Sequence, residues 1–158
     1  FLLIVGVHVL TRAMALSQVP NELAQLIVEL GLGRVELLLI LIAVYFVLGM
    51  FMDTLAMMLL TIPVLLAPLK AVGVDPLWFG VFLVIMAEVG LLTPPLGILS
   101  FIVHRIASDP KANLGNPISL QTVFVGVAPF AATAILVILL LIAFPEIVTW
   151  LPGASSSQ

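Results

Sequence analysis

Residues 123–144 form an apolar run without a single charged side chain. A helix needs about 20 such residues to cross the hydrocarbon core of a bilayer, so this run predicts a transmembrane helix. The whole chain shares this character: of its 158 residues, 63% are hydrophobic and 8% are charged. Soluble domains carry about 25% charged residues. The composition therefore indicates an all-α protein embedded in the lipid bilayer and excludes a soluble domain with one anchor helix.

Several kinds of function are excluded by what the sequence lacks. The formal net charge is −3 with only five Lys and Arg residues, which leaves no basic surface for phosphates and excludes nucleic acid binding. The chain has no Cys, and His8 and His104 are far apart in the sequence. Disulfides, thiolate metal sites and a local histidine metal site are therefore not expected, and we expect no cofactor.

The N-terminal part predicts two different helices. Residues 1–16 are apolar apart from His8 and Arg12 and predict the end of a transmembrane helix. No basic segment precedes this run and no small-residue cleavage site follows it, so it does not resemble a signal peptide; we interpret the chain as the C-terminal portion of a longer membrane protein. Residues 17–33 predict an interfacial amphipathic arm helix, either a linker resting on the bilayer or a rigid connection between moving parts. Its expected apolar face consists of Leu23, Leu26, Ile27 and Leu30.

Asp53 separates two apolar runs within residues 34–72, and each run has about 16 residues, fewer than the roughly 20 of a spanning helix. This pattern predicts a re-entrant helical hairpin whose tip, residues 49–53, lies at membrane depth. Non-helical backbone at that depth is tolerated only inside protein or beside a water-filled cavity. Two ordinary helices joined by a loop are the alternative. At a hairpin tip, the carboxylate is expected to cap the helix that starts at Thr54 rather than to bind an ion directly.

A pair of prolines interrupts the next apolar segment, residues 77–105. Pro94 and Pro95 remove two backbone donors and lie between Gly90 and Gly97. This combination predicts a discontinuous transmembrane helix. The alternative is an ordinary kink whose free backbone groups are satisfied by hydroxyl side chains or water.

Both irregular segments offer oxygen ligands. Residues 49–54 supply the carboxylate of Asp53 and the hydroxyl of Thr54, and residues 90–97 supply unpaired carbonyls and the Thr93 hydroxyl. Broken helices hold substrates and coupling ions in many secondary transporters. Oxygen donors suit a hard cation, and Na⁺ is the natural candidate.

Glu88 is the second acid placed at membrane depth. A charged carboxylate costs about 2.5 to 3.5 kcal/mol near the bilayer centre, so this side chain must be paired, hydrated or neutral. The sequence leaves open whether it binds anything.

The C-terminal part sets the orientation. Residues 119–150 predict the final transmembrane helix, and residues 151–158 predict a disordered tail. His104, Arg105 and Lys111 form the largest basic cluster in a short loop, so this loop is expected in the cytoplasm and the C-terminus outside.

An ordered series of segments resembles a known family. The series consists of GMFMD at 49–53, IPVLLAPL at 62–69, GVDPLWFGV at 73–81 and EVGLLTPPLG at 88–97. Together with the basic loop and the long final helix, it is similar to the C-terminal part of the large membrane subunit of tripartite ATP-independent periplasmic (TRAP) transporters. The resemblance covers nearly the whole chain. Met86 and Leu99 depart from it, because Asn is common at both places in the family.

The resemblance implies a sodium-coupled importer of organic acids, such as C4-dicarboxylates, in the bacterial inner membrane with a periplasmic C-terminus. Its partners would be a small membrane subunit and a periplasmic substrate-binding protein. The chain would correspond to the second of two inverted repeats, whose hairpins and broken helices make an elevator movement.

The family pattern also implies where Na⁺ binds: between Gly49 at the hairpin tip and Gly90, Thr93 and Leu96 at the break. The supporting elements would be Asp53, Thr54, Pro94, Pro95 and Gly97. Three other functions compete with this interpretation. They are a sodium-coupled carrier of another family, a structural membrane subunit, and an intramembrane hydrolase that pairs Asp53 with Glu88.

Overall fold

The computed structural model of the chain describes residues 2–94, 97–109 and 118–155. Within these ranges all regular secondary structure is helical, and α3, α4 and α8 are long and apolar enough to cross a membrane. The helices are α1 (Leu2–Ser17), α2 (Val19–Glu29), α3 (Arg34–Phe51), α4 (Thr54–Ala71), α5 (Pro76–Leu92), α6 (Ile98–Ala107), α8 (Leu120–Ala143) and α9 (Glu146–Ser155). The predicted all-α class is confirmed for these residues.

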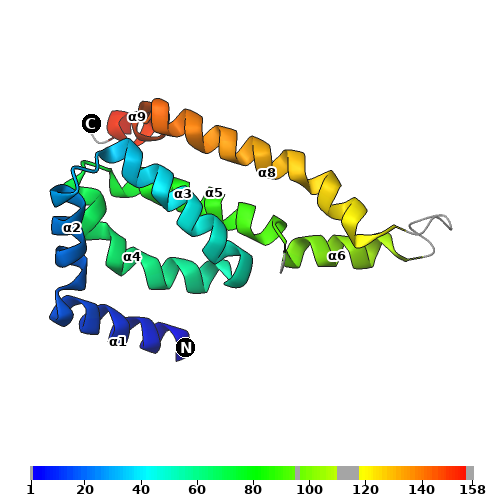
Figure 1. Ribbon diagram of the computed structural model, residues 1–158, viewed down its shortest axis with the longest axis horizontal. Coiled ribbons are helices and arrows are strands. Elements are labelled where there is room, and N and C mark those ends of the chain that lie inside the picture. Colours follow the sequence, from blue (N-terminus) through cyan, green and yellow to red (C-terminus); the bar gives the residue numbers. More distant parts are fainter. Residues whose placement is uncertain (1, 95–96, 110–117, 156–158) are drawn as a thin grey trace.

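Helix α5 lies at the centre of the fold and packs against α3, α4 and α8 (Figure 1). The core is aromatic: Tyr45 of α3 makes edge-to-face contacts with Phe79 and Phe82 of α5, and Phe82 stacks on Trp78. Each of these four side chains is at most 2% exposed. Aromatic side chains of this size dominate the energetics of a core, so α3 and α5 form its most specific contact.

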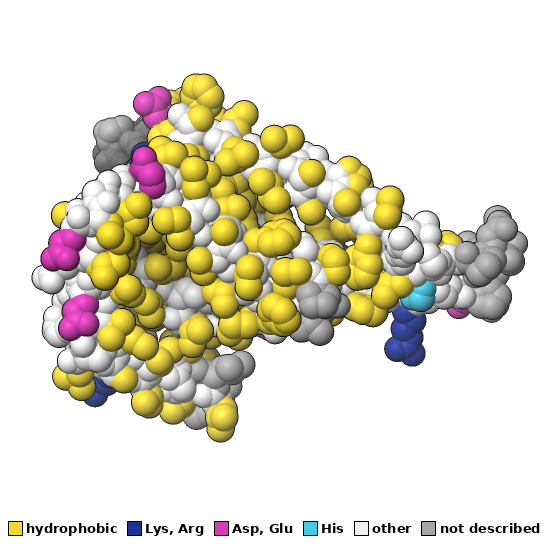
Figure 2. Space-filling model, in the orientation of Figure 1, with side chains coloured by type: hydrophobic (Ala, Val, Ile, Leu, Met, Phe, Trp, Pro, Cys, Tyr) yellow, Lys and Arg dark blue, Asp and Glu magenta, His cyan; other side chains and the backbone are white. Residues whose placement is uncertain are grey.

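Hydrophobic side chains are also exposed along the whole length of the face shown in Figure 2. Most of the acidic side chains visible in that view gather at the end of the molecule that holds α2. Helix α8 has few buried residues along its length; they are Val123, Ile138, Leu141 and Ile142. Such a large apolar surface is stable only against lipid or further protein.

Helices α3 and α4 run in opposite directions and are joined by Met52 and Asp53 (Figure 1). Each helix has 18 residues. The premise that the two arms are too short to cross a membrane was therefore wrong, because the helices extend beyond the apolar runs to Arg34 and Ala71. Helix α4 also continues through Pro63 and Pro68.

Helix α2 packs along α4 rather than lying by itself. Ile27 enters the core, whereas Leu26 and Leu30 are 51% and 64% exposed. The expected apolar face is therefore only partly used, because contact with α4 covers one side of that stripe. A sharp turn at Gln18, with φ of 58°, separates α2 from α1.

Helices α5 and α6 follow one another roughly in line, with an interruption between them (Figure 1). The side chain of Asp75 caps α5 by accepting from the backbone N–H of Leu77 at 2.7 Å. The helix ends at Leu92, and helical structure resumes at Ile98. The interruption predicted from the proline pair is confirmed.

The end of the chain differs from the prediction. The long helix α8 ends at Ala143 instead of residue 150, because Pro145 cannot donate to the helix and pushes Phe144 out of the helical conformation. A separate helix, α9, runs from Glu146 to Ser155 where a disordered tail had been expected from residue 151. The last three residues, 156–158, and Lys111 of the basic loop lie outside the described residues.

Candidate functional site

Gly49 and Gly90 bring the backbones of α3 and α5 into direct contact. A Cβ atom added to Gly49 would lie 2.8 Å from the Cα atom of Gly90. One added to Gly90 would lie 2.5 Å from the Cα atom of Gly49 and 2.9 Å from its carbonyl oxygen. Both residues are buried. The hairpin tip and the end of α5 therefore meet at a point where no larger side chain fits unless the backbone moves.

This contact joins two helix ends that are rich in free carbonyls. Gly49 belongs to the last turn of α3, where carbonyl groups have no partner within the helix. At the end of α5, Pro94 and Pro95 have no N–H to donate to the carbonyls of Gly90 and Leu91. The Gly90 carbonyl accepts instead from the N–H of Thr93 at 3.2 Å, a bond across three residues that is common at helix ends, and keeps a second lone pair free.

The side chain of Thr93 is oriented by its own helix. Its hydroxyl donates a hydrogen bond of 2.7 Å to the Val89 carbonyl. A hydroxyl has one proton and two acceptor positions, so the Thr93 oxygen can still accept a hydrogen bond or bind a cation. Its carbonyl accepts from the N–H of Gly97 at 3.0 Å, which helps to hold the two sides of the interruption together.

A buried serine makes a second bridge across the interruption. Ser100 of α6 is fully buried, and its hydroxyl donates a hydrogen bond of 3.0 Å to the Leu92 carbonyl at the end of α5. Ser100 was not among the site residues predicted from the sequence. A hydroxyl in the first turn after a proline pair was the available indication, because such a pair leaves carbonyls that need donors.

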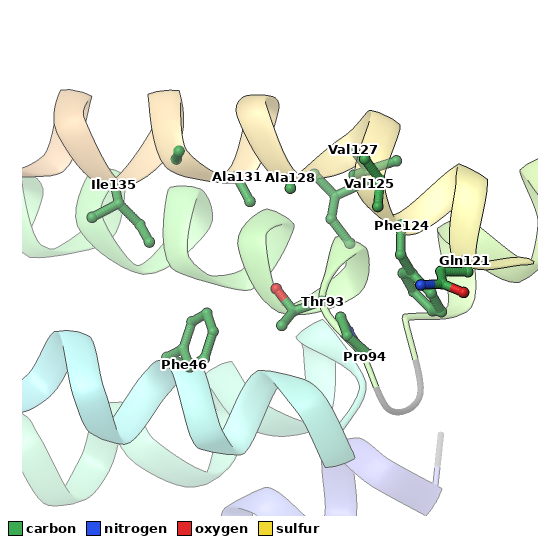
Figure 3. A pocket seen from close by; sticks show the side chains of 12 residues that line it. Phe46, Thr93, Pro94, Gln121, Phe124, Val125, Val127, Ala128, Ala131 and Ile135 are labelled. Carbon is green, nitrogen blue, oxygen red and sulfur yellow. The ribbon is translucent and has the colours of Figure 1, made fainter.

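Thr93 and Pro94 face a cavity of about 450 Å³ between the interruption, α3 and α8 (Figure 3). Phe46 lies on the α3 side, and Phe124, Ala128 and Ala131 lie on the α8 side. Apart from Thr93 and the Gln121 amide, the described side chains that line the cavity are apolar. This wall offers space but few groups that could recognise a carboxylate.

Asp53 acts as the N-cap of α4. Its Oδ2 atom accepts a hydrogen bond from the backbone N–H of Leu55 at 3.1 Å, and its side chain is exposed. The expectation that this carboxylate caps the second arm is confirmed. The neighbouring Thr54 hydroxyl is buried, and within the described residues it has no hydrogen-bond partner. Both acceptor positions and the proton of this hydroxyl are thus not engaged by any described group.

The structure brings only some of the candidate residues together. Gly49 and Gly90 are in contact, and Thr93 lies within one turn of Gly90. Glu88 lies on the other side of α5 from Gly90, because positions that are two residues apart are separated by about 200° around a helix. Pro95 and Leu96 lie outside the described residues. Among the described residues, no three His, Asp or Glu side chains gather into a group that could hold a metal.

Comparisons with known proteins place this arrangement in context. A family profile described as "Tripartite ATP-independent periplasmic transporter, DctM component" matches residues 1–147. The sialic acid TRAP transporter large permease protein SiaM of Vibrio cholerae is 32% identical over 151 residues, which are 96% of this chain and 33% of that protein.

Two further relatives are similar over nearly the same region. The sialic acid TRAP transporter permease protein SiaT of Haemophilus influenzae is 32% identical over 96% of this chain and 23% of its own length. The C4-dicarboxylate TRAP transporter large permease protein DctM of Pseudomonas aeruginosa is 33% identical over 94% of this chain and 30% of its own length. The chain thus spans about a third or less of the length of these relatives.

Proposed function

Because the chain belongs to the DctM component family of tripartite ATP-independent periplasmic transporters, we propose that it forms part of the large permease subunit of a secondary transporter. This permease is a carrier of the bacterial inner membrane, without covalent chemistry. The apolar helices α3, α4 and α8 support a place in the bilayer. The relatives named above are about three times as long or longer, so the chain supplies one part of the transport path.

The proposed coupling ion is Na⁺, bound between the hairpin tip and the interruption by backbone oxygens of Gly49, Gly90 and Leu96 and by the Thr93 hydroxyl. The observation that carries this proposal is the contact between Gly49 and Gly90. It brings carbonyl-rich ends of two helices to one point beside a hydroxyl that keeps free lone pairs. Asp53, Thr54, Pro94, Pro95 and Gly97 shape the backbone around this point.

The proposal includes a re-entrant hairpin formed by α3 and α4. Both helices are long enough to cross a membrane, so the support comes from their position. The turn between them lies near the interruption of α5 and α6 and well short of the far end of α6 (Figure 1). If α5 and α6 together cross the bilayer, the hairpin tip ends inside it. Elevator movement of this hairpin with the broken helix is part of the same proposal.

The family and the relatives support a proposal for the substrate and the partners. The names of the relatives refer to sialic acid and C4-dicarboxylates, which are both carboxylates, so we propose import of an organic acid. A periplasmic substrate-binding protein delivers it, and a small membrane subunit completes the permease. The α2 helix, the turn at residues 73–75 and α9 lie at one end of the molecule (Figure 1), and this end is proposed to face the periplasm.

The test is uptake by the complete permease with its partners in vesicles. Replacing external Na⁺ by K⁺ at a fixed membrane potential is expected to abolish uptake of the organic acid. Raising the potential, negative inside, is expected to speed uptake, since one net charge gains about 2.3 kcal/mol per 100 mV. Undiminished uptake in K⁺ would contradict sodium coupling.

A further inference from the structure

Helix α5 has one face that the rest of the described chain does not cover. Its buried face carries Trp78, Phe82, Met86 and Gly90 together with neighbouring side chains. The opposite face carries Leu77, Gly80, Val84 and Glu88, all exposed and spaced three or four residues apart. A Cβ atom added to Gly80 would meet nothing within 4 Å. We call the surface formed by Gly80, Val84 and Glu88 the open face of α5.

The position of Glu88 makes this open face unsuitable for lipid. Along α5, Glu88 lies about 18 Å from Pro76, at a rise of 1.5 Å per residue. The polar turn with Asp75 lies at that end, whereas α6 continues beyond the interruption to His104 and Arg105. Glu88 is therefore far from both polar ends of the segment formed by α5 and α6. Ionisable side chains at such depth face protein or water and have partners.

No partner for Glu88 exists within the described part of the chain: no described residue donates to it or pairs with it. Its neighbours one turn away on α5 include the apolar Val84 and Leu91, and Gly80 lies one turn beyond Val84 on the same face. A glycine on an apolar helix surface allows another helix to approach closely. The open face thus combines a space for a neighbouring backbone with an acceptor that needs a donor.

We propose that the open face of α5 packs against a transmembrane helix of the same permease that lies outside this chain, and that this helix donates a hydrogen bond or an ion pair to Glu88. The occupant follows from length and charge. SiaM of Vibrio cholerae contains two thirds of its sequence outside the matched region, and a donor at membrane depth complements the carboxylate. The inference rests on the proposed membrane permease and does not depend on which ion or solute it carries.

Thermal unfolding of the purified full-length permease tests the donor. Glu88→Leu removes the acceptor and leaves the donor buried and unpaired, which is costly, so Tm is expected to fall by several degrees. Glu88→Gln keeps an acceptor and is expected to lose less. If Glu88 faces lipid, Glu88→Leu removes an unfavourable group and raises Tm. An unchanged or raised Tm for Glu88→Leu overturns the proposal.

A matched pair of glycines tests the close packing. Gly126 of α8 resembles Gly80, because an added Cβ atom would also meet nothing within 4 Å, but α8 carries no charged residue. Gly80→Leu is expected to lower Tm by several degrees, whereas Gly126→Leu is expected to leave it nearly unchanged. Equal effects of the two substitutions would show that the open face is no different from an ordinary apolar surface.

Cysteine labelling shows whether the open face of α5 is covered by protein or lines a water-filled passage. This chain contains no Cys, so Val84→Cys can be studied in a permease whose other cysteines are replaced. A water-soluble maleimide is expected to label Val84→Cys only after denaturation, while the exposed control Lys70→Cys is labelled in native membranes. Rapid native labelling at Val84→Cys would mean a water-filled passage and would overturn the proposal. These readouts need no sodium and no transport, so they succeed or fail independently of the uptake test.

Discussion

The indole nitrogen of Trp78 in α5 donates a hydrogen bond of 3.1 Å to the carbonyl oxygen of Leu141 in α8. In a continuous helix this carbonyl would accept the N–H of residue 145, but Pro145 has none. The indole thus replaces the missing donor and fixes the end of α8 against the central helix. The guanidinium of Arg34 lies over the same ring, 5.5 Å from its centroid, within the range of cation–π interactions.

Trp78→Phe is therefore expected to destabilise the permease. The substitution keeps an aromatic ring but leaves the buried Leu141 carbonyl without a donor, which costs about 1–3 kcal/mol. The measurement is chemical or thermal unfolding of the purified protein. Trp150, which is 72% exposed, provides the control, and Trp150→Phe should change stability little. Equal stability of the two variants would show that the indole hydrogen bond is unimportant.

Ser100→Ala tests the bridge across the interruption. Loss of the buried hydroxyl leaves the Leu92 carbonyl unsatisfied, and stability is expected to fall by about 1–3 kcal/mol. If the bridge also positions the ion site, the sodium concentration for half-maximal uptake should rise. Ser17→Ala, at an exposed serine, is the control and should stay within about 0.5 kcal/mol of the parent protein. A variant with parental stability and parental sodium dependence would make Ser100 dispensable.

Gly90→Ala tests the close contact between α3 and α5. The new methyl group would lie 2.5 Å from the Gly49 Cα atom, and such overpacking costs about 1–3 kcal/mol. We expect a lower Tm and, because the proposed site would be distorted, loss of the Na⁺-dependent stabilisation that the proposal predicts for the parent protein. Gly126→Ala meets open space and should be neutral or stabilising by up to about 1 kcal/mol. A normal sodium response in Gly90→Ala would remove this glycine from the proposed site.

Thr93→Val tests whether the hydroxyl oxygen of Thr93, rather than the shape of its side chain, is needed for Na⁺ binding. The two side chains have nearly the same volume, but Val has no oxygen. The sodium concentration for half-maximal uptake is expected to rise by about tenfold, which corresponds to about 1.4 kcal/mol. Thr93→Ser keeps the oxygen and should retain most of the affinity. Unchanged sodium dependence in Thr93→Val would limit the hydroxyl to its hydrogen bond with Val89.

The local features of the fold could be predicted from the sequence where one residue type decides the backbone. Pro94 and Pro95 located the interruption of the helix, and Asp53 located the turn of the hairpin and the cap of α4. The same reasoning applied to Pro145 would have ended α8 correctly. The run of apolar residues around Pro145 concealed that end.

Contacts between segments that are far apart in the sequence could not be predicted from the pattern of residues. Trp78 and Leu141 are 63 residues apart. The pattern of apolar residues predicts which helices form, but it does not predict which carbonyl the indole binds. The packing of α2 on α4 was missed for the same reason, since an amphipathic helix can bury its apolar stripe against lipid or protein alike. The meeting of Gly49 and Gly90 was expected only through the resemblance to a family, because glycine itself gives no periodic pattern.

The touching backbones of Gly49 and Gly90 also bear on how such a protein can vary. A contact made by two main chains contains no side chain that could be exchanged for another of different chemistry. Substitutions elsewhere can reshape the surrounding walls, including the apolar cavity beside Thr93, without altering the atoms that meet here. The place where the two backbones cross can therefore stay constant while the side chains around it change in size and chemistry.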